Sequence, residues 1–332
     1  MGCTPREATT IPMAAAPPLA PAAAAAASNA YHYTIRFDDE LTRVDALLCA
    51  DVSVEELLPS APGGKPYLLS AKQGVVDCRL TDGVAKLPKP APGCVRYAVD
   101  LARMFENRSW HRGVVKIGHS ALLSPDPRLW TPHPRDESRD VKVTFELPAG
   151  MQLALPWPTA QTTIPPNAFV WKMQGAIGTY ERSQIAMRGG HIDVAVLGGG
   201  WGARTPAVLA WLKQSAASVD KLFGGMPTKR AQVVMLPVEA GSYGFGLATR
   251  GGGDVVSLFI SPDITAAELA PNWMAVHELL HFSLPTIQNE DAWLYEGFVT
   301  YLAAVARAQS GMVTAPFAWG ELLDGFKRGR TV

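Results

Sequence analysis

The sequence has few charged residues and no excess of either sign. Only 18% of its 332 residues are charged, and 30 basic side chains balance 30 acidic ones. Proteins that bind nucleic acid or anionic membranes nonspecifically depend on net positive charge. The composition therefore argues against functions of that kind, and we expect no nucleic-acid partner.

The sequence also lacks a long run of large apolar side chains. The longest nearly apolar stretch, residues 13–27, consists almost entirely of Ala and Pro. Proline would break a helix before it crossed about 30 Å of hydrocarbon. We predict no transmembrane helix here and interpret residues 1–30 as a disordered Ala/Pro tether, too poor in large side chains to offset its ordering entropy.

No secretory signal precedes this tether in the sequence as it stands. Gly2-Cys3-Thr4-Pro5 is nevertheless similar to the start of a mature bacterial lipoprotein, in which the cysteine is acylated. We therefore hypothesise that translation starts further upstream and that the protein is a lipoprotein of the cell envelope or periplasm. Its contact with a membrane would then be through Cys3. The alternative is a cytoplasmic protein.

Cysteine is scarce, with four residues in the whole chain and no Cys-x-x-Cys pair. This number is too small for a disulfide-based scaffold, and the spacing is not that of a metal knuckle or redox motif. If Cys3 is acylated, at most one intrachain disulfide can form among Cys49, Cys78 and Cys94. Cys78 with Cys94 is the pair to test, although we expect buried free thiols.

The part of the chain that follows the tether consists of short β-type runs separated by Pro, Gly and Asp. Strand-forming runs at this spacing, without helical periodicity, are typical of an antiparallel sandwich. We therefore predict an antiparallel β-sandwich domain over residues 31–188. Its expected strands are residues 31–37, 43–49, 95–99, 114–119, 141–147 and 169–173.

After residue 188 the pattern changes to strands that alternate with helices. Thr205 is predicted to cap a helix that has Pro206 as its first residue and ends near residue 223. The other expected elements are strands at 191–197 and 231–237, a hairpin of 245–249 with 254–261, and helices at 271–284 and 291–308, the last capped by Asp291. Residues 189–332 are thus predicted to form an α/β domain.

Residues 277–281 read His-Glu-Leu-Leu-His. Histidines four apart on a helix project from one face, so His277 and His281 can bind one cation while Glu278 lies beside it. A chain of this composition would contain such a pattern by chance roughly 0.006 times. Glu296, near the start of the next predicted helix, can supply a third ligand. Glu290 and Asp291 are the alternative third ligands.

Two histidines and one glutamate leave one position of a tetrahedral zinc ion open for water, as in catalytic sites. Zinc lowers the pKa of the bound water to about 7 and polarises a substrate carbonyl. Glu278 would act as the general base that takes the water proton and passes it to the leaving amine. We therefore predict one Zn²⁺ per chain and hydrolysis of peptide bonds.

The sequence resembles the glycyl-aminopeptidase-like family of gluzincin metallopeptidases. The resemblance is carried by HELLHFSLP at residues 277–285 and by WLYEGFVTYLA at residues 293–303. It implies a β domain followed by a thermolysin-like domain, with zinc bound to His277, His281 and Glu296. It also implies that Glu278 is the general base and that the substrate is a peptide or protein.

The family resemblance further implies an edge strand beside the metal, onto which a peptide adds by β-pairing. Residues 245–249 or 254–261 would supply this strand. Family aminopeptidases have Gly-Leu-Glu-His there, and its glutamate helps to hold the free amine of the substrate. This chain has Gly246-Leu247-Ala248-Thr249 instead. These four residues are candidate substrate-binding residues, and both aminopeptidase and endopeptidase action stay open.

The resemblance also predicts that the thermolysin-like domain is incomplete. The catalytic domain of the family continues through several more helices, one of which carries a tyrosine that assists the oxyanion. The present sequence ends 36 residues after Glu296. Tyr295 and Tyr301 are near in sequence, and we expect both to be core residues.

Two other functions are compatible with the sequence. A peptidase fold without its last helices could be a catalytically inactive binding protein. A dinucleotide-binding oxidoreductase is the second alternative, because residues 195–203 (Ala-Val-Leu-Gly-Gly-Gly-Trp-Gly-Ala) fit a relaxed G-x-G-x-x-G/A pattern between a strand and a helix. The acidic residue expected about 20 residues later is absent, so we interpret these glycines as a flexible connection.

Overall fold

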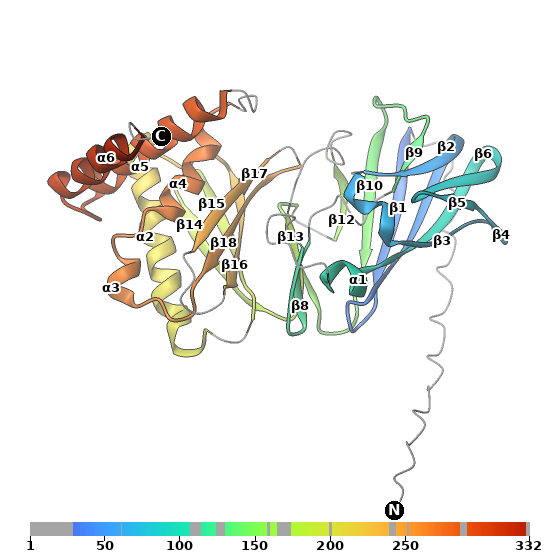
Figure 1. Cartoon of the computed structure of the whole chain (residues 1–332), viewed down its shortest axis with the longest axis horizontal. Coiled ribbons are helices and arrows are strands. Elements are labelled where there is room, and N and C mark those ends of the chain that lie inside the picture. The colour runs from blue at the N-terminus through green and yellow to red at the C-terminus, as the bar shows by residue number, and fades with distance from the viewer. Residues whose placement is uncertain are drawn as a thin grey trace, which may run out of the picture.

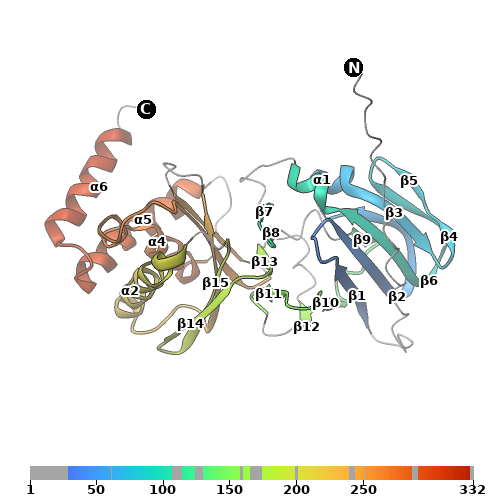
Figure 2. The ribbon, with the colours of Figure 1, turned by 90° about the horizontal axis from the view of Figure 1, so that it is seen from below.

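A computed structural model describes residues 29–60, 62–106, 114–123, 130–157, 160–164, 174–198, 201–238, 244–250, 252–285 and 291–329. Figures 1 and 2 show three sheets in succession, with a group of helices at the end of the molecule opposite the largest sheet. Residues 1–28 of the predicted tether and the predicted strand at 169–173 lie outside the described residues. No helix in the described part of the chain has the length and apolar character needed to cross a membrane.

The largest sheet has nine strands in the described ranges, in the order β12-β10-β1-β2-β6-β3-β4, with β5 beside β6 and β9 beside β2. Its strands are β1 (Ala30–Phe37), β2 (Arg43–Pro59), β3 (Leu68–Gln73), β4 (Val76–Asp77), β5 (Arg79–Thr81), β6 (Val84–Asp100), β9 (Trp130–His133), β10 (Asp140–Glu146) and β12 (Gln161–Ile164). A 3₁₀ turn, η1 (Pro62–Tyr67), precedes β3, and a short helix, α1 (Leu101–Glu106), follows β6.

One strand pair in this sheet departs from the predicted antiparallel arrangement. β1 and β10 run parallel. Parallel neighbours need a long crossover, and here the chain passes through β2 to β9 before it returns to β1. The prediction of a purely antiparallel sheet is therefore wrong at this pair.

A four-stranded sheet lies between the other two sheets. It has the order β11-β13-β8-β7 and consists of β7 (Val115–Ile117), β8 (Ser120–Leu123), β11 (Gln152–Ala154) and β13 (Gly175–Gly178). Successive side chains of a strand point to opposite faces. On β8, Ala121 and Leu123 join the core of the nine-stranded sheet, whereas Leu122 packs against the five-stranded sheet. Both faces of this sheet are therefore buried.

The third sheet has five strands among the described residues, in the order β14-β15-β16-β18-β17. They are β14 (Glu181–Met187), β15 (Gly190–Val196), β16 (Arg230–Pro237), β17 (Phe245–Thr249) and β18 (Asp254–Ile260). The three inner strands are parallel, and the two outer ones pair antiparallel to them. β14, although it lies within residues 31–188, is hydrogen-bonded to β15 and so belongs to this sheet.

Helices cover the face of this sheet that points away from the four-stranded sheet (Figure 1). They are α2 (Thr205–Phe223), α3 (Ala266–Leu269), α4 (Met274–Leu280) and α5 (Ala292–Ser310), with 3₁₀ turns η4 (Gly202–Arg204) before α2 and η5 (His281–Ser283) after α4. α6 (Ala315–Gly329) packs on α5 and lies further from the sheet (Figure 2). Val194, Val233 and Val256 point to the helices, and the residues that alternate with them point to the four-stranded sheet. A sheet buried on both faces explains the almost continuous apolar runs of its inner strands.

The helix starts differ in detail from the predictions. Thr205 is the first residue of α2 and not its cap, because η4 leads directly into the helix and Arg204 stands at the capping position. Asp291 is at the capping position of α5, as predicted, but its side chain makes no capping hydrogen bond. α6 is a helix for which the sequence pattern predicted no element.

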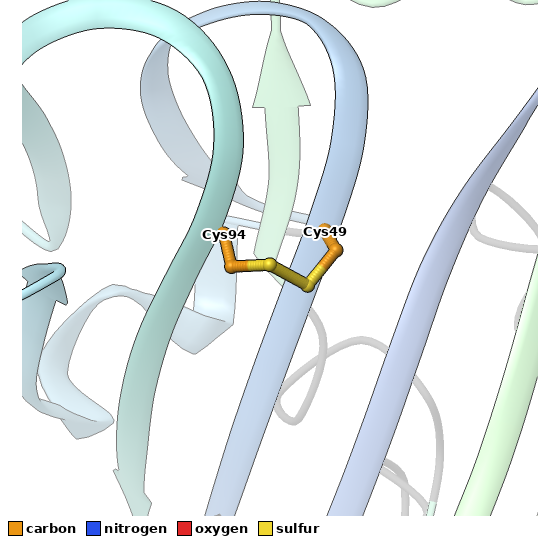
Figure 3. Close-up of a disulfide and its surroundings, with 2 residues drawn as sticks. All are labelled: Cys49 and Cys94. Carbon is orange, nitrogen blue, oxygen red and sulfur yellow. A yellow bond between two sulfur atoms is a disulfide. The ribbon is translucent and has the colours of Figure 1, made fainter. Parts of the chain in front are cut away.

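The disulfide joins Cys49 and Cys94 (Figure 3). These residues are directly opposite each other in the antiparallel pair β2 and β6. Cys78, which precedes β5, is a free thiol whose side chain lies in the core of the nine-stranded sheet. The prediction that Cys78 pairs with Cys94 is therefore wrong, and so is the expectation that all the cysteines are free thiols. The register of β2 and β6 places Cys49, and not Cys78, beside Cys94.

Candidate metal centre

The structure brings the three predicted ligands together. His277 lies on α4, His281 is the residue after it, and Glu296 lies on α5. Their ligand atoms all lie within 4.8 Å of one another. Glu296 Oε2 is 3.1 Å from His277 Nε2 and 3.6 Å from His281 Nε2. In a tetrahedral site with bonds of about 2.0–2.1 Å, ligand atoms lie about 3.3 Å apart, so these separations fit a zinc ion.

The environment of the histidines also suits a metal. His277 is 6% exposed and His281 is 5% exposed. Burial lowers the pKa of His277, and burial together with the charge of His277 lowers the pKa of His281 to about 3. Both shifts favour the neutral imidazole, which is the form that binds metals. The side chain of Glu296 is 54% exposed, so the centre is open on the α5 side.

The second nitrogen of each imidazole has no partner among the described residues. His277 Nδ1 and His281 Nδ1 are both buried and make no hydrogen bond there. Their Nε2 atoms face Glu296. The orientation of the two rings in the described structure therefore does not come from Nδ1 hydrogen bonds, which commonly orient histidine ligands.

Glu278 lies beside the three ligands without belonging to them. Its Oε2 atom is 4.0 Å from His281 Nε2, and its side chain is only 9% exposed. Burial raises the pKa of Glu278 to about 8, the backbone N–H of Ala248 opposes this by donating to the carboxylate, and the charge of Glu296 adds to it. A bound dication would favour the ionised carboxylate. This placement is compatible with the predicted role of Glu278 as general base, which stays a prediction.

β17 passes next to Glu278 and is the outer strand of its sheet. A Cβ atom on Gly246 would lie 2.7 Å from Glu278 Oε1, so any larger residue here would require the Glu278 side chain to move. β18 lies between β16 and β17, and the alternative that it is the edge strand is therefore wrong. Residues 246–249, predicted to bind substrate, all lie on β17. That role stays a prediction.

Three residues contribute contacts that the sequence did not predict. Tyr295 donates its hydroxyl hydrogen to the carbonyl oxygen of His281 at 3.2 Å. Arg250, just after β17, donates to the carbonyl oxygen of Leu284. Tyr301 was expected in the core but is 44% exposed and contacts the ring of Trp319. Helical periodicity does not tell which neighbour a residue meets, so no sequence signal pointed to these contacts.

The first glycine of the Gly-Gly-Gly run has a structural explanation. Gly198 has a φ of +75°, and a Cβ atom there would lie 2.7 Å from Ile117 Cγ2 of the four-stranded sheet. Both the backbone conformation and this close contact require glycine. Gly199 and Gly200 lie outside the described residues.

Comparisons with solved structures identify a protein of similar fold. An aminopeptidase N family protein from Idiomarina loihiensis aligns with a TM-score of 0.64 over 85% of this chain, at 15% sequence identity. The two chains share a fold. At this identity the similarity shows the fold alone, and the present chain spans 55% of the length of that protein. No protein-family model and no curated protein matches the sequence.

Two other solved structures align less well. An M1 zinc metallopeptidase variant from Deinococcus radiodurans has a TM-score of 0.47 and 16% identity over 91% of this chain and 74% of its own. Legionella pneumophila aminopeptidase A, in complex with aspartic acid, has a TM-score of 0.47 and 13% identity over 84% of this chain and 37% of its own. TM-scores below 0.5 add nothing to the fold assignment.

Proposed function

We propose that this protein is a zinc metallopeptidase that hydrolyses peptide bonds. The observation that carries the proposal is the convergence of His277, His281 and Glu296 beside a buried Glu278 that is not a ligand. The fold shared with a protein named as an aminopeptidase N family member supports the same reaction class.

Each residue has a separate role in this proposal. His277, His281 and Glu296 would hold one Zn²⁺, which when bound supplies a water of lowered pKa and a Lewis acid for the carbonyl. Glu278 accepts the proton of the attacking water and donates it to the departing amine nitrogen. The Ala248 N–H and the space left by Gly246 hold the Glu278 carboxylate in place.

The proposed substrate is an extended peptide that pairs with β17. The outer edge of this strand has no neighbour among the described strands, and main-chain groups at such an edge bind peptides by strand addition. Gly246, Leu247, Ala248 and Thr249 would then form the substrate-binding strand. None of the four carries a carboxylate to hold a free amine, so the proposal does not include aminopeptidase specificity.

We also propose an oxidising location for the protein. The Cys49–Cys94 disulfide is of the kind that forms and persists outside the reducing cytosol. This supports the hypothesis of a cell-envelope lipoprotein acylated at Cys3. Fractionation of the source organism, with detection of a lipid on the Cys3 peptide by mass spectrometry, tests it. An unmodified Cys3 in the soluble fraction would contradict it.

The proposed reaction is tested with the purified protein and two variants. We expect the unsubstituted protein to bind one zinc ion and to cleave unstructured fluorogenic peptides. His281→Ala should lose the zinc, whereas Glu278→Gln should keep it and lose hydrolysis. Equal activity of Glu278→Gln would refute the mechanism. Zinc binding by the unsubstituted protein without any hydrolysis would instead favour a peptide-binding protein with an inactive peptidase fold.

A further inference from the structure

His281 lies at the point where α4 ends. His277 is inside the helix, and its backbone N–H donates to the carbonyl oxygen of Trp273. His281 instead stands at the C-cap position, and the chain continues from it as the η5 turn. The regular helix therefore holds the backbone of His277 more firmly than that of His281.

Tyr295 contacts His281 from the neighbouring helix. Its hydroxyl donates to the carbonyl oxygen of His281 at 3.2 Å, and its ring centroid lies 4.6 Å from the imidazole centroid with the planes inclined by 35°. His281 Nδ1 has no hydrogen-bond partner in the described part of the chain. The Tyr295 ring is thus a contact that can orient the imidazole. Tyr295 is adjacent to Glu296 on α5, so its contact also connects His281 to the helix that carries Glu296.

Arg250 holds the same segment from the side of the sheet. Its Nη1 atom donates to the carbonyl oxygen of Leu284, and its guanidinium carbon lies 5.7 Å from the centre of the Phe282 ring. Arg250 directly follows β17, the strand whose Gly246 and Ala248 approach Glu278. Residues 281–284 are therefore attached both to α5 and to the strand beside the general base.

We propose that Tyr295 and Arg250 are positioning residues for the metal ligand His281, acting through its ring and through the backbone of residues 281–284. We name this pair the His281 clamp. The proposal rests on the proposed zinc site and adds to it two residues that hold one of its three ligands. Neither residue supplies a ligand atom to the His277, His281 and Glu296 cluster. Outer contacts of this kind typically change metal affinity by about 10–100-fold.

Tyr295→Phe tests the first half of the clamp, because it removes the hydroxyl and keeps the ring. Tyr301→Phe is the matched control on the same helix, since Tyr301 lies away from the ligands against Trp319. Zinc affinity is measured by competition with a chelator of known affinity, and cobalt absorption spectra report the ligand geometry. We expect affinity to fall about tenfold in Tyr295→Phe with a shifted cobalt spectrum, and neither to change in Tyr301→Phe.

Arg250→Gln tests the second half and separates positioning from charge. A purely electrostatic role predicts tighter zinc binding in this variant, because a positive charge near the dication is removed. The clamp predicts weaker binding, again by about tenfold. Unfolding temperatures of the zinc-free proteins verify that each variant is folded.

The outcomes distinguish the clamp from the zinc site itself. If the unsubstituted protein binds no zinc, the proposed function is overturned, and the clamp with it. If that protein binds zinc and both variants keep its affinity and cobalt spectrum, the clamp alone is overturned. Tighter binding in Arg250→Gln overturns the positioning role of Arg250.

Discussion

Gly246 shows how one residue type affects the position of Glu278, the proposed general base. β17 passes so close to α4 that a Cβ atom at this position would lie 2.7 Å from both Cδ and Oε1 of Glu278. Two residues further along the same strand, the Ala248 N–H donates to the Glu278 carboxylate. The missing side chain of Gly246 thus leaves room for Glu278, and the backbone hydrogen bond from Ala248 holds its carboxylate.

We expect Gly246→Ala to impair catalysis without removing the metal. The added methyl group must displace Glu278, and an error of about 1 Å at a catalytic group costs up to about 100-fold in rate. Peptide hydrolysis should therefore fall by about 10–100-fold, while zinc content, measured by atomic emission, stays at one per chain. Gly320→Ala on α6 is the control, because its Cβ atom would meet nothing within 4 Å. Full activity of Gly246→Ala would show that Glu278 is not the base.

The two longest strands, β2 and β6, are joined by both hydrogen bonds and a disulfide. Their antiparallel register places Cys49 opposite Cys94, and the covalent bond links residues 45 positions apart in the chain. Cys49 is buried. Closing a loop of this length restricts the unfolded chain, which is the main route by which disulfides stabilise proteins in the chain-entropy model.

We expect the double substitution of Cys49→Ala and Cys94→Ala to lower the free energy of unfolding by about 2–4 kcal/mol. Urea denaturation followed by circular dichroism measures this change. A reducing agent should lower the midpoint of the unsubstituted protein towards that of the double variant and leave the variant unaffected. Insensitivity of the unsubstituted protein to reductant would contradict the predicted contribution of this disulfide.

Across the molecule, α4 and α5, which carry the candidate metal centre, lie on the helix side of the five-stranded sheet, far from the nine-stranded sheet (Figures 1 and 2). Every residue of α4 is buried, and this helix shares its core with α2 and α5. The candidate ligands come from α4 with the turn that follows it and from α5, so a bound ion would join segments that are otherwise held by side-chain packing and by the Tyr295–His281 hydrogen bond. Under the proposed function, metal binding would therefore be coupled to the folding of the C-terminal half.

We expect zinc to raise the thermal stability of the whole protein. At a free zinc concentration of 100 times the dissociation constant, the free energy of unfolding should rise by about 2.7 kcal/mol. Differential scanning calorimetry should thus show a lower unfolding temperature after treatment with a chelator, restored when zinc is added back. His281→Ala should respond to neither treatment. An equal response in that variant would place the metal at another site.

Local residue patterns were sufficient for β15 to β18, for α2, α4 and α5, and for the candidate ligands, but not for α3, α6 or β14. The helical repeat of about 3.6 residues places residues four apart on one face, so His277 and His281 could be paired from their spacing. Glu296 could be added because it lies near the start of the next predicted helix. Strands β15, β16 and β18 were predicted from apolar runs bounded by turn residues, and β17 was predicted as the other half of a hairpin with β18.

Contacts between distant parts of the chain were needed for the rest. The parallel pairing of β1 with β10, the bond between Cys49 and Cys94, and the contact of Gly246 with Glu278 each join segments that no local pattern relates. Tyr295 could be placed beside His281 only after α4 and α5 were packed together. The spacing of apolar residues predicts which face of a helix or strand is buried. Which other helix or strand packs against that face is decided only when the complete elements pack together.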